Sequence, residues 1–111
     1  MMTEGELQDK IRLALGRIPG LVLWRNNIGR TQSAKGWIWY GVGNPGGADL
    51  IGCYLGRFVA IEVKTATGRQ SPEQRDWQGV VERAGGVYLL VRSVEEAVKL
   101  VGNLRPLTQA G

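Results

Sequence analysis

Three charged residues frame two apolar runs near the middle of the sequence. Asp49 precedes the first run, Glu62 and Lys64 close the second, and the pair Leu55-Gly56 between them is suited to a two-residue turn. Such a turn would place Asp49 opposite Glu62 on antiparallel strands, with Cβ atoms roughly 5 Å apart. Because side chains alternate along a strand, Glu62 and Lys64 share one face while Val63 points to the other. Two carboxylates and one ammonium group would therefore converge on one spot.

The two carboxylates predict a cation between them, because like charges at this separation repel and are costly to bury together. The chain contains no histidine, which excludes Ser-His-Asp and Cys-His catalysis and also excludes zinc held by histidine. Oxygen ligands suit a hard divalent ion, and Mg²⁺ typically uses one or two carboxylates. The main-chain carbonyl of Val63 could add a ligand, and Glu4 could add another directly or through water.

Lys64 would stand beside this ion. It could orient or deprotonate an attacking water, or it could stabilise negative charge that develops on a phosphate. These two roles need different protonation states, and the sequence does not separate them. The alternative for the whole group is a surface ion-pair cluster, in which Glu62 and Lys64 face solvent and Asp49 caps a turn.

A helix over residues 3–17 would carry Glu4 toward the same place. Thr3 is a suitable N-cap, and Glu6 completes a capping box. Glu4 lies three residues before Leu7 and so projects toward the apolar side of the helix, although it could simply complement the helix dipole. The apolar positions follow helical spacing: Leu7, Ile11, Ala14, Leu15 and Ile18.

A second helix begins at Ser71-Pro72, which combines an N-cap with a first-turn proline. Its predicted apolar face consists of Trp77, Val80, Val81 and Ala84. Gln74 shares the face of Trp77, so it is either a member of a capping box or a polar group directed back at the two carboxylates.

The segment before Asp49 predicts a strand at Leu21–Asn27, a polar and basic stretch over 28–36, and a strand at Trp37–Tyr40. Together they suggest a β-hairpin with a long cationic tip and aromatic sides, which could contact phosphates and stack on bases. The alternative is a solvated loop over partly buried tryptophans. Four glycines in 41–48 predict a close backbone approach that delivers Asp49 to its strand.

The remaining chain completes an α/β fold with a mixed sheet flanked by helices. Strand Val87–Val91 follows a helical crossover, so we expect it to lie parallel to the strand that ends at Lys64. Val94–Val101 predicts a last helix with Val94, Ala97, Val98 and Val101 inward, and 103–111 a loose tail. Cys53, within an apolar run, is expected to be buried.

The composition fits one domain over residues 1–111. The net charge of +4 and the isoelectric point near 9.6 favour an acidic partner such as nucleic acid, although many small basic proteins bind none. The chain has a single cysteine and no apolar run of about 20 residues, and its first residues do not resemble a signal peptide. We therefore expect a cytoplasmic protein without membrane contact.

These features resemble the PD-(D/E)xK nuclease superfamily and, within it, the virus-type replication-repair nuclease (VRR-NUC) family. The similarity spans about residues 4 to 100, and Ala48 stands where the family usually has proline. It rests on five motifs: Glu4-x-x-Leu7-Gln8, Arg25-Asn26-Asn27, Gly46-Gly47-Ala48-Asp49, Ile61-Glu62-Val63-Lys64 and Gln74-x-x-Trp77.

The resemblance implies a restriction-endonuclease-like fold and a structure-selective DNA endonuclease that depends on Mg²⁺ or Mn²⁺ and is similar to Holliday-junction resolvases. It implies Asp49, Glu62 and Lys64 as catalytic residues, supported by Glu4 and Gln74. Metal ligands would come from Asp49, Glu62, Glu4 and the Val63 carbonyl. Independently of the resemblance, the positions of four basic residues make them candidate phosphate contacts, namely Arg25, Arg30, Lys35 and Arg69.

Stand-alone relatives are often of phage origin, which implies a bacterial or phage-infected host cell and a homodimer on branched or junction DNA. The dimer would form through Trp37–Tyr40 or the last helix. The alternatives are a flap or general nuclease that acts as a monomer, and a non-catalytic nucleic-acid-binding module of the same fold.

Overall fold

A four-stranded mixed sheet forms the centre of the molecule in the computed structural model, which describes residues 2–107. Its order is β1 (Leu21–Arg25), β4 (Leu50–Tyr54), β5 (Arg57–Val63) and β6 (Val87–Val91). The first two pairings are antiparallel, and β5 and β6 run parallel. The predicted mixed sheet and its parallel last strand are therefore confirmed.

The predicted turn at Leu55-Gly56 is also confirmed. Tyr54 pairs with Arg57 across the turn, and both turn residues have positive φ, 43° for Leu55 and 93° for Gly56. These values match the two-residue turns that suit the twist of a hairpin. The resulting register, with Leu50 opposite Ile61, places Asp49 and Glu62 just beyond the last pair.

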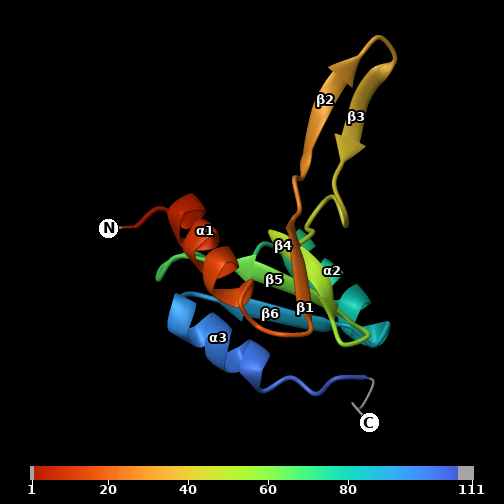
Figure 1. Cartoon of the computed structure of the whole chain (residues 1–111). Coiled ribbons are helices and arrows are strands. Elements are labelled where there is room, and N and C mark those ends of the chain that lie inside the picture. The colour runs from red at the N-terminus through yellow and green to blue at the C-terminus, as the bar shows by residue number, and fades with distance from the viewer. Residues whose placement is uncertain (1, 108–111) are drawn as a thin grey trace.

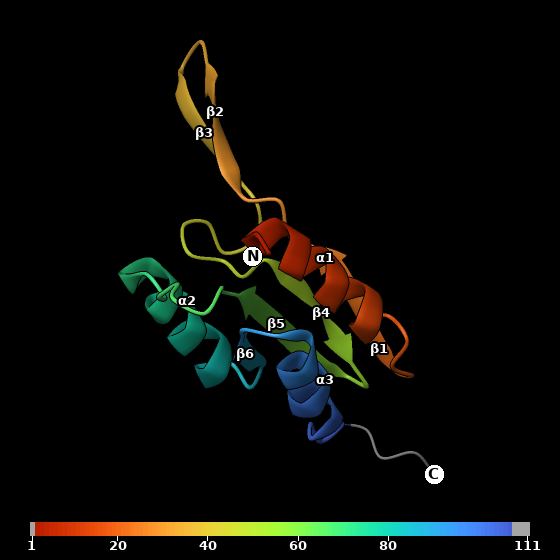
Figure 2. The same ribbon diagram turned by 90° about the vertical axis from the view of Figure 1, so that its left-hand side faces the viewer.

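Three helices cover the sheet (Figures 1 and 2). Helices α1 (Glu4–Leu15) and α3 (Val94–Gly102) lie side by side on one face, and α2 (Pro72–Arg83) covers the other. Each helix begins at a side chain that caps it, namely Thr3, Ser71 and Ser93.

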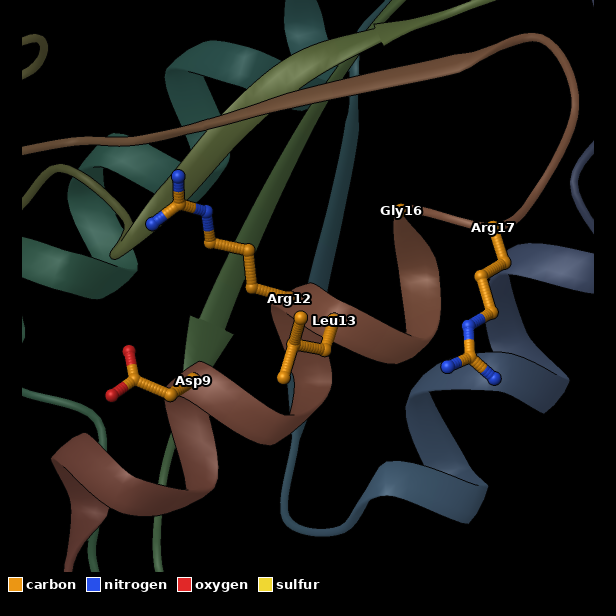
Figure 3. Close-up of a pocket in the computed structure, with 5 residues that line it drawn as sticks. All are labelled: Asp9, Arg12, Leu13, Gly16 and Arg17. Carbon is orange, nitrogen blue, oxygen red and sulfur yellow. The ribbon is translucent and has the colours of Figure 1, made fainter.

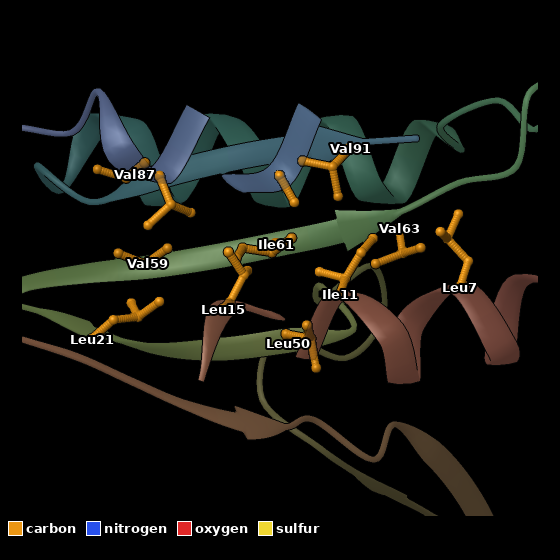
Figure 4. Packing of buried hydrophobic residues seen from close by; sticks show 12 residues of the cluster. Leu7, Ile11, Leu15, Leu21, Leu50, Val59, Ile61, Val63, Val87 and Val91 are labelled. Carbon is orange, nitrogen blue, oxygen red and sulfur yellow. The ribbon is translucent and has the colours of Figure 1, made fainter. Parts of the chain in front are cut away.

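Two apolar clusters divide the core between these faces. Alternation along β5 sends Val59, Ile61 and Val63 toward α1 and α3, and sends Ala60 and Glu62 toward the side of α2. Figure 4 shows the larger cluster, in which three leucine and isoleucine side chains of α1 pack on the sheet. These are Leu7, Ile11 and Leu15. Glu62 is thus the exception in an otherwise apolar buried strand.

The predicted hairpin between Leu21–Asn27 and Trp37–Tyr40 is wrong, because the structure contains a second, two-stranded sheet with different pairing. The polar segment expected as a long tip is itself strand β2 (Gly29–Ser33), and it pairs with β3 (Gly36–Tyr40) around a tight turn. Strand β1 pairs with β4 instead, because Leu21 and Leu23 contribute to the larger core cluster. The β2–β3 hairpin projects from the sheet (Figure 1), and the radius of gyration of 14.7 Å exceeds the about 13 Å typical of a compact domain of this size.

Several burial predictions are wrong, and each error lies where no element covers the residue. Cys53 is exposed and lies between two other exposed side chains of the sheet, Val22 on β1 and Phe58 on β5. Val80 and Val98 point to solvent from helices that bury only one narrow side, and Ala84 is exposed at the C-cap of α2.

The predicted loose tail is wrong for residues 103–107. The Leu107 N–H donates to the Leu55 carbonyl at 3.1 Å, and Leu104 packs against the larger core cluster. Residues 108–111 of that predicted tail lie outside the described residues. Within residues 2–107, no helix is long and apolar enough to cross a membrane.

Candidate active site

Asp49 and Glu62 come together at one end of β4 and β5. The main-chain N–H of Val63 donates to Oδ2 of Asp49 at 2.9 Å, which ties the aspartate to the last residue of β5. Asp49 also raises the pKa of Glu62, through a side-chain hydrogen bond and through its negative charge, and both effects require the two carboxyl groups to lie close together. The two carboxyl groups are thus neighbours, as the register of the hairpin requires.

Glu62 is buried, with 1% of its surface exposed, and this excludes the surface ion-pair alternative. Its Oε2 atom has no hydrogen-bond partner, the only such buried side-chain atom among the described residues. Burial raises the pKa of Glu62 to about 9, and the hydrogen bond and charge of Asp49 add to this rise. The positive charge of Lys64 opposes the shift, and Glu4 adds to it. Without a cation nearby, the carboxyl group therefore keeps its proton at neutral pH.

The donor set fits a hard divalent ion. A buried carboxylate oxygen without a partner, beside a second carboxylate, is an arrangement that a cation would stabilise, and oxygen ligands suit Mg²⁺ or Mn²⁺. Residues 2–107 contain no group of three or more acidic or cysteine side chains arranged to hold one ion. Glu4 is exposed in the first turn of α1, and its negative charge adds to the rise in the pKa of Glu62. Its predicted role as a metal ligand, either direct or through water, stays a prediction.

Lys64 directly follows β5 and is partly buried. Its N–H donates to the Val91 carbonyl at 3.0 Å, which extends the parallel pairing by one residue. The next loop is held by Arg92, whose guanidinium donates to the carbonyls of Thr65 and Gly68 at 2.6 and 2.7 Å. A side chain at Gly68 would contact the stem of Lys64, so Arg92 supports the loop that packs against this lysine.

Asn26 fixes the glycine-rich loop that delivers Asp49. Its amide nitrogen donates to the carbonyls of Val42 and Ala48 at 2.8 and 2.9 Å, and its amide oxygen accepts from the Val42 N–H at 3.0 Å. Its own N–H donates to the Asp49 carbonyl at 2.8 Å. Sequence reasoning quoted Asn26 only as part of a motif and gave it no role.

The close approach predicted for this loop is confirmed. A Cβ atom at Gly43 would overlap the indole of Trp77, and one at Gly46 would overlap the carbonyl of Glu73 in α2. Both glycines also have positive φ, 77° and 98°, which other residues rarely adopt. The loop can therefore lie directly against α2.

We expect Asn26→Ala to lower the free energy of unfolding by about 2–3 kcal/mol, because three side-chain hydrogen bonds are lost at once. Chemical denaturation measures this change, and hydrogen exchange should show faster opening of residues 41–49. Asn27→Ala is the matched control: Asn27 is exposed, and the change should cost less than about 0.5 kcal/mol. Equal stability of the two variants would contradict the assigned role of Asn26.

Two surface hollows meet at Asp49. One is lined by Trp39, Ser71 and Gln74, and the other by Gln8, Arg25, Asn26 and Tyr40. The Gln74 side chain accepts from the Ser71 N–H at 2.9 Å, so it completes the capping box and also lines the first hollow. Gln8 is a buried polar residue that sequence reasoning did not propose for the site. Its position beside Leu7 on the buried side of α1 was the available signal.

The four predicted phosphate contacts do not gather into one patch. Arg25 lines the second hollow near Asp49, whereas Arg30 and Lys35 lie along the β2–β3 hairpin and its turn. Arg69 is exposed just before α2. Of the four, Arg25 is the one that lines a hollow together with Asp49.

A further pocket lies on the outer side of α1 and does not include Asp49 (Figure 3). Arg12 and Arg17 extend away from each other there, so the polar groups do not converge on one point. Its lining residues are Asp9, Arg12, Leu13, Gly16 and Arg17, none of which is a predicted site residue.

Comparisons with known proteins add one finding on the fold. No family model matches the chain, and no curated protein matches it. A solved structure described as "VRR_NUC domain" matches 92% of this chain and 97% of its own, with a TM-score of 0.65 and 18% identity. The chain therefore has the mixed α/β fold of a VRR_NUC domain.

Proposed function

We propose that this chain is a metal-dependent endonuclease that hydrolyses phosphodiester bonds in DNA, with branched or junction DNA as its preferred substrate. The observation that carries this proposal is the buried Glu62 carboxyl group, which has an oxygen without a partner and lies beside Asp49. A pure binding surface has no use for two adjacent acids, because they repel phosphate. The VRR_NUC fold supports the choice of a nuclease.

In this proposal Asp49, Glu62 and the Val63 carbonyl hold Mg²⁺ or Mn²⁺, and Glu4 contributes through water. When bound, the ion supplies positive charge to the scissile phosphate and acidifies water. Lys64 stands near Glu62 and either accepts a proton from the attacking water as the neutral amine or stabilises the phosphate as the ammonium. Gln74 and Arg92 hold, respectively, the first turn of α2 and the loop beside Lys64.

The charge distribution supports a polyanionic substrate. Residues 10–48 contain no acidic residue, and their six cationic residues are Lys10, Arg12, Arg17, Arg25, Arg30 and Lys35. Phosphate contacts dominate the affinity of proteins for DNA, so this uninterrupted basic segment favours a nucleic acid over an acidic protein. A homodimer would present two active sites to a branched duplex.

We expect cleavage of a four-way junction in Mg²⁺ or Mn²⁺, none in EDTA, and none by Asp49→Asn, which removes a ligand charge while conserving shape. Lys64→Met should lower the rate strongly while leaving DNA binding in EDTA nearly unchanged. The measurement is a cleavage gel that compares junction, 5′ flap, 3′ flap, duplex and single strand. Asp76→Asn is the control, because Asp76 is an exposed acid of α2 away from the two carboxylates.

Cleavage by Asp49→Asn at the wild-type rate would reject the site. Equal cutting of flaps and plain duplex by a monomer would favour the general nuclease, and binding without cutting would favour the non-catalytic module. Sedimentation at micromolar concentration tests the homodimer separately, and a monomer alone would remove that part of the proposal.

A further inference from the structure

The β2–β3 hairpin exposes four consecutive large apolar side chains. Each residue of Trp37–Tyr40 is about half exposed, on a hairpin that projects from the sheet (Figure 1). A cluster of this kind on a soluble domain marks a binding surface more often than single exposed residues do. Neither the packing of the core nor the proposed chemistry uses these side chains.

One face of the hairpin combines aromatic rings with a cation. The register places Arg30 opposite Trp39 and Gln32 opposite Trp37, and alternation puts these four side chains on the same face. The Arg30 guanidinium lies 4.3 Å from the centre of the Trp37 ring and 5.5 Å from that of Trp39. Aromatic rings with an adjacent arginine form the platform on which unpaired bases stack.

The foot of the hairpin is tied to the site. The Asn44 amide nitrogen donates to the carbonyls of Gly29 and Tyr40 at 2.7 and 2.8 Å, which anchors both strands to the loop that leads to Asp49. Trp39 and Tyr40 point to opposite faces and line the two hollows that meet at Asp49. A DNA strand that lay along the hairpin would therefore be directed toward the two carboxylates.

The positive charge of the β2–β3 hairpin favours DNA as the partner that binds its aromatic surface. The hairpin carries Arg30 and Lys35 and no acid, within the longer basic segment over 10–48. Two copies that paired through this surface would bring like charges together, whereas a DNA strand complements them and offers bases to the rings.

We propose that the face formed by Arg30, Trp37 and Trp39 stacks on unpaired bases of a DNA strand and thereby places the boundary between single-stranded and paired DNA next to Asp49. This deepens the proposed nuclease function and depends on it for the choice of occupant. In this inference, a stacking surface selects branched substrates, and base-specific contacts are not needed.

The test uses full-length chain in EDTA and two DNAs that carry 2-aminopurine, one in an unpaired arm and one within duplex. We expect Trp37→Ala to weaken binding of the single-stranded arm about tenfold, the effect of losing one base–aromatic stack, and to abolish quenching of its 2-aminopurine. Binding of the duplex should fall much less. Trp37→Phe, which keeps a ring, should restore most of the loss.

Trp24→Ala is the matched control, since Trp24 is 57% exposed on β1 against 53% for Trp37 on the hairpin. It should bind both DNAs like the wild type. Equal losses for Trp37→Ala and Trp24→Ala, or a loss that is the same for both DNAs, would overturn the inference. The inference would also be overturned if Trp37→Ala converted a dimer to a monomer without any change in 2-aminopurine quenching, because the hairpin would then be a contact between two copies of the chain. A Trp37-dependent loss in a protein that cuts no DNA would reject the proposed nuclease function while retaining the stacking surface.

Discussion

Replacing Glu62 with glutamine is expected to abolish metal-dependent cleavage and, at the same time, to make the metal-free protein more stable. Activity should fall about a thousandfold, at the upper end of losses for one charge-stabilising group, since the amide carries no charge for a cation. Stability should rise because the buried carboxyl group, whose pKa is about 9, is replaced by a neutral isostere that can donate to Asp49.

Single-turnover cleavage and thermal unfolding in EDTA at pH 8 measure the two effects. We expect a melting temperature at least about 4 °C above that of the wild type, which corresponds to roughly 1 kcal/mol in a domain of this size. Glu95→Gln, an exposed acid in the first turn of α3, is the control and should change neither quantity appreciably. A variant that cuts normally, or one that is less stable than the wild type without metal, would contradict the account of Glu62.

The stability of the metal-free protein is expected to fall as the pH rises from about 5 to about 9. Glu62 has a pKa of 4.5 in its ordinary state and about 9 in the fold, so in this range the folded chain keeps a proton that the unfolded chain releases. Because the unfolded state then binds fewer protons, each rise in pH favours unfolding, and the slope disappears below the lower value and above the higher one.

Added Mg²⁺ or Mn²⁺ should reverse this trend, because an ion that binds the ionised carboxylate displaces its proton. The stabilisation by metal should therefore grow with pH, and calorimetry in buffers of different ionisation enthalpy should detect the released proton. Urea titrations from pH 5 to 9.5, with metal or EDTA, measure both slopes. Glu62→Gln should flatten them, and a steep slope that persists in this variant would assign the effect to another group.

The central hairpin could be predicted because its signals are local. Leu55-Gly56 fixes a two-residue turn, and counting outward from it gives the register that brings Asp49 to Glu62. The alternation of side chains along the strand then places Glu62 and Val63 on opposite faces of the sheet. No tertiary information is needed for any of these steps.

The partner predicted for strand Trp37–Tyr40 was wrong because its true partner, β2 (Gly29–Ser33), has no apolar side chain on either face. Pattern analysis finds a strand by its apolar side, and a strand that no core covers has none. Its formation follows from main-chain hydrogen bonding with the aromatic strand beside it.

The supporting residues of the site escaped prediction for a different reason. Asn26 and Arg92 act through hydrogen bonds to carbonyls 16 to 27 positions away along the chain, and such bonds leave no periodic pattern. Glu4 shows the converse limit. Helical spacing predicts the side of α1 that carries Glu4, but its distance from the carboxylates depends on how α1 packs on the sheet.

In the proposed complex with DNA, the length of the β2–β3 hairpin would set the distance between the stacked bases and the position of the cut. Trp37 stands three positions from Tyr40 at the foot, which spans about 10 Å of strand. Stacked nucleotides advance about 3.4 Å along one strand, so this span accommodates about three of them. A DNA strand held by Trp37 would thus have about three nucleotides between its outermost stacked base and the foot of the hairpin, and lengthening the hairpin by two residues per strand would move the cut by about two nucleotides.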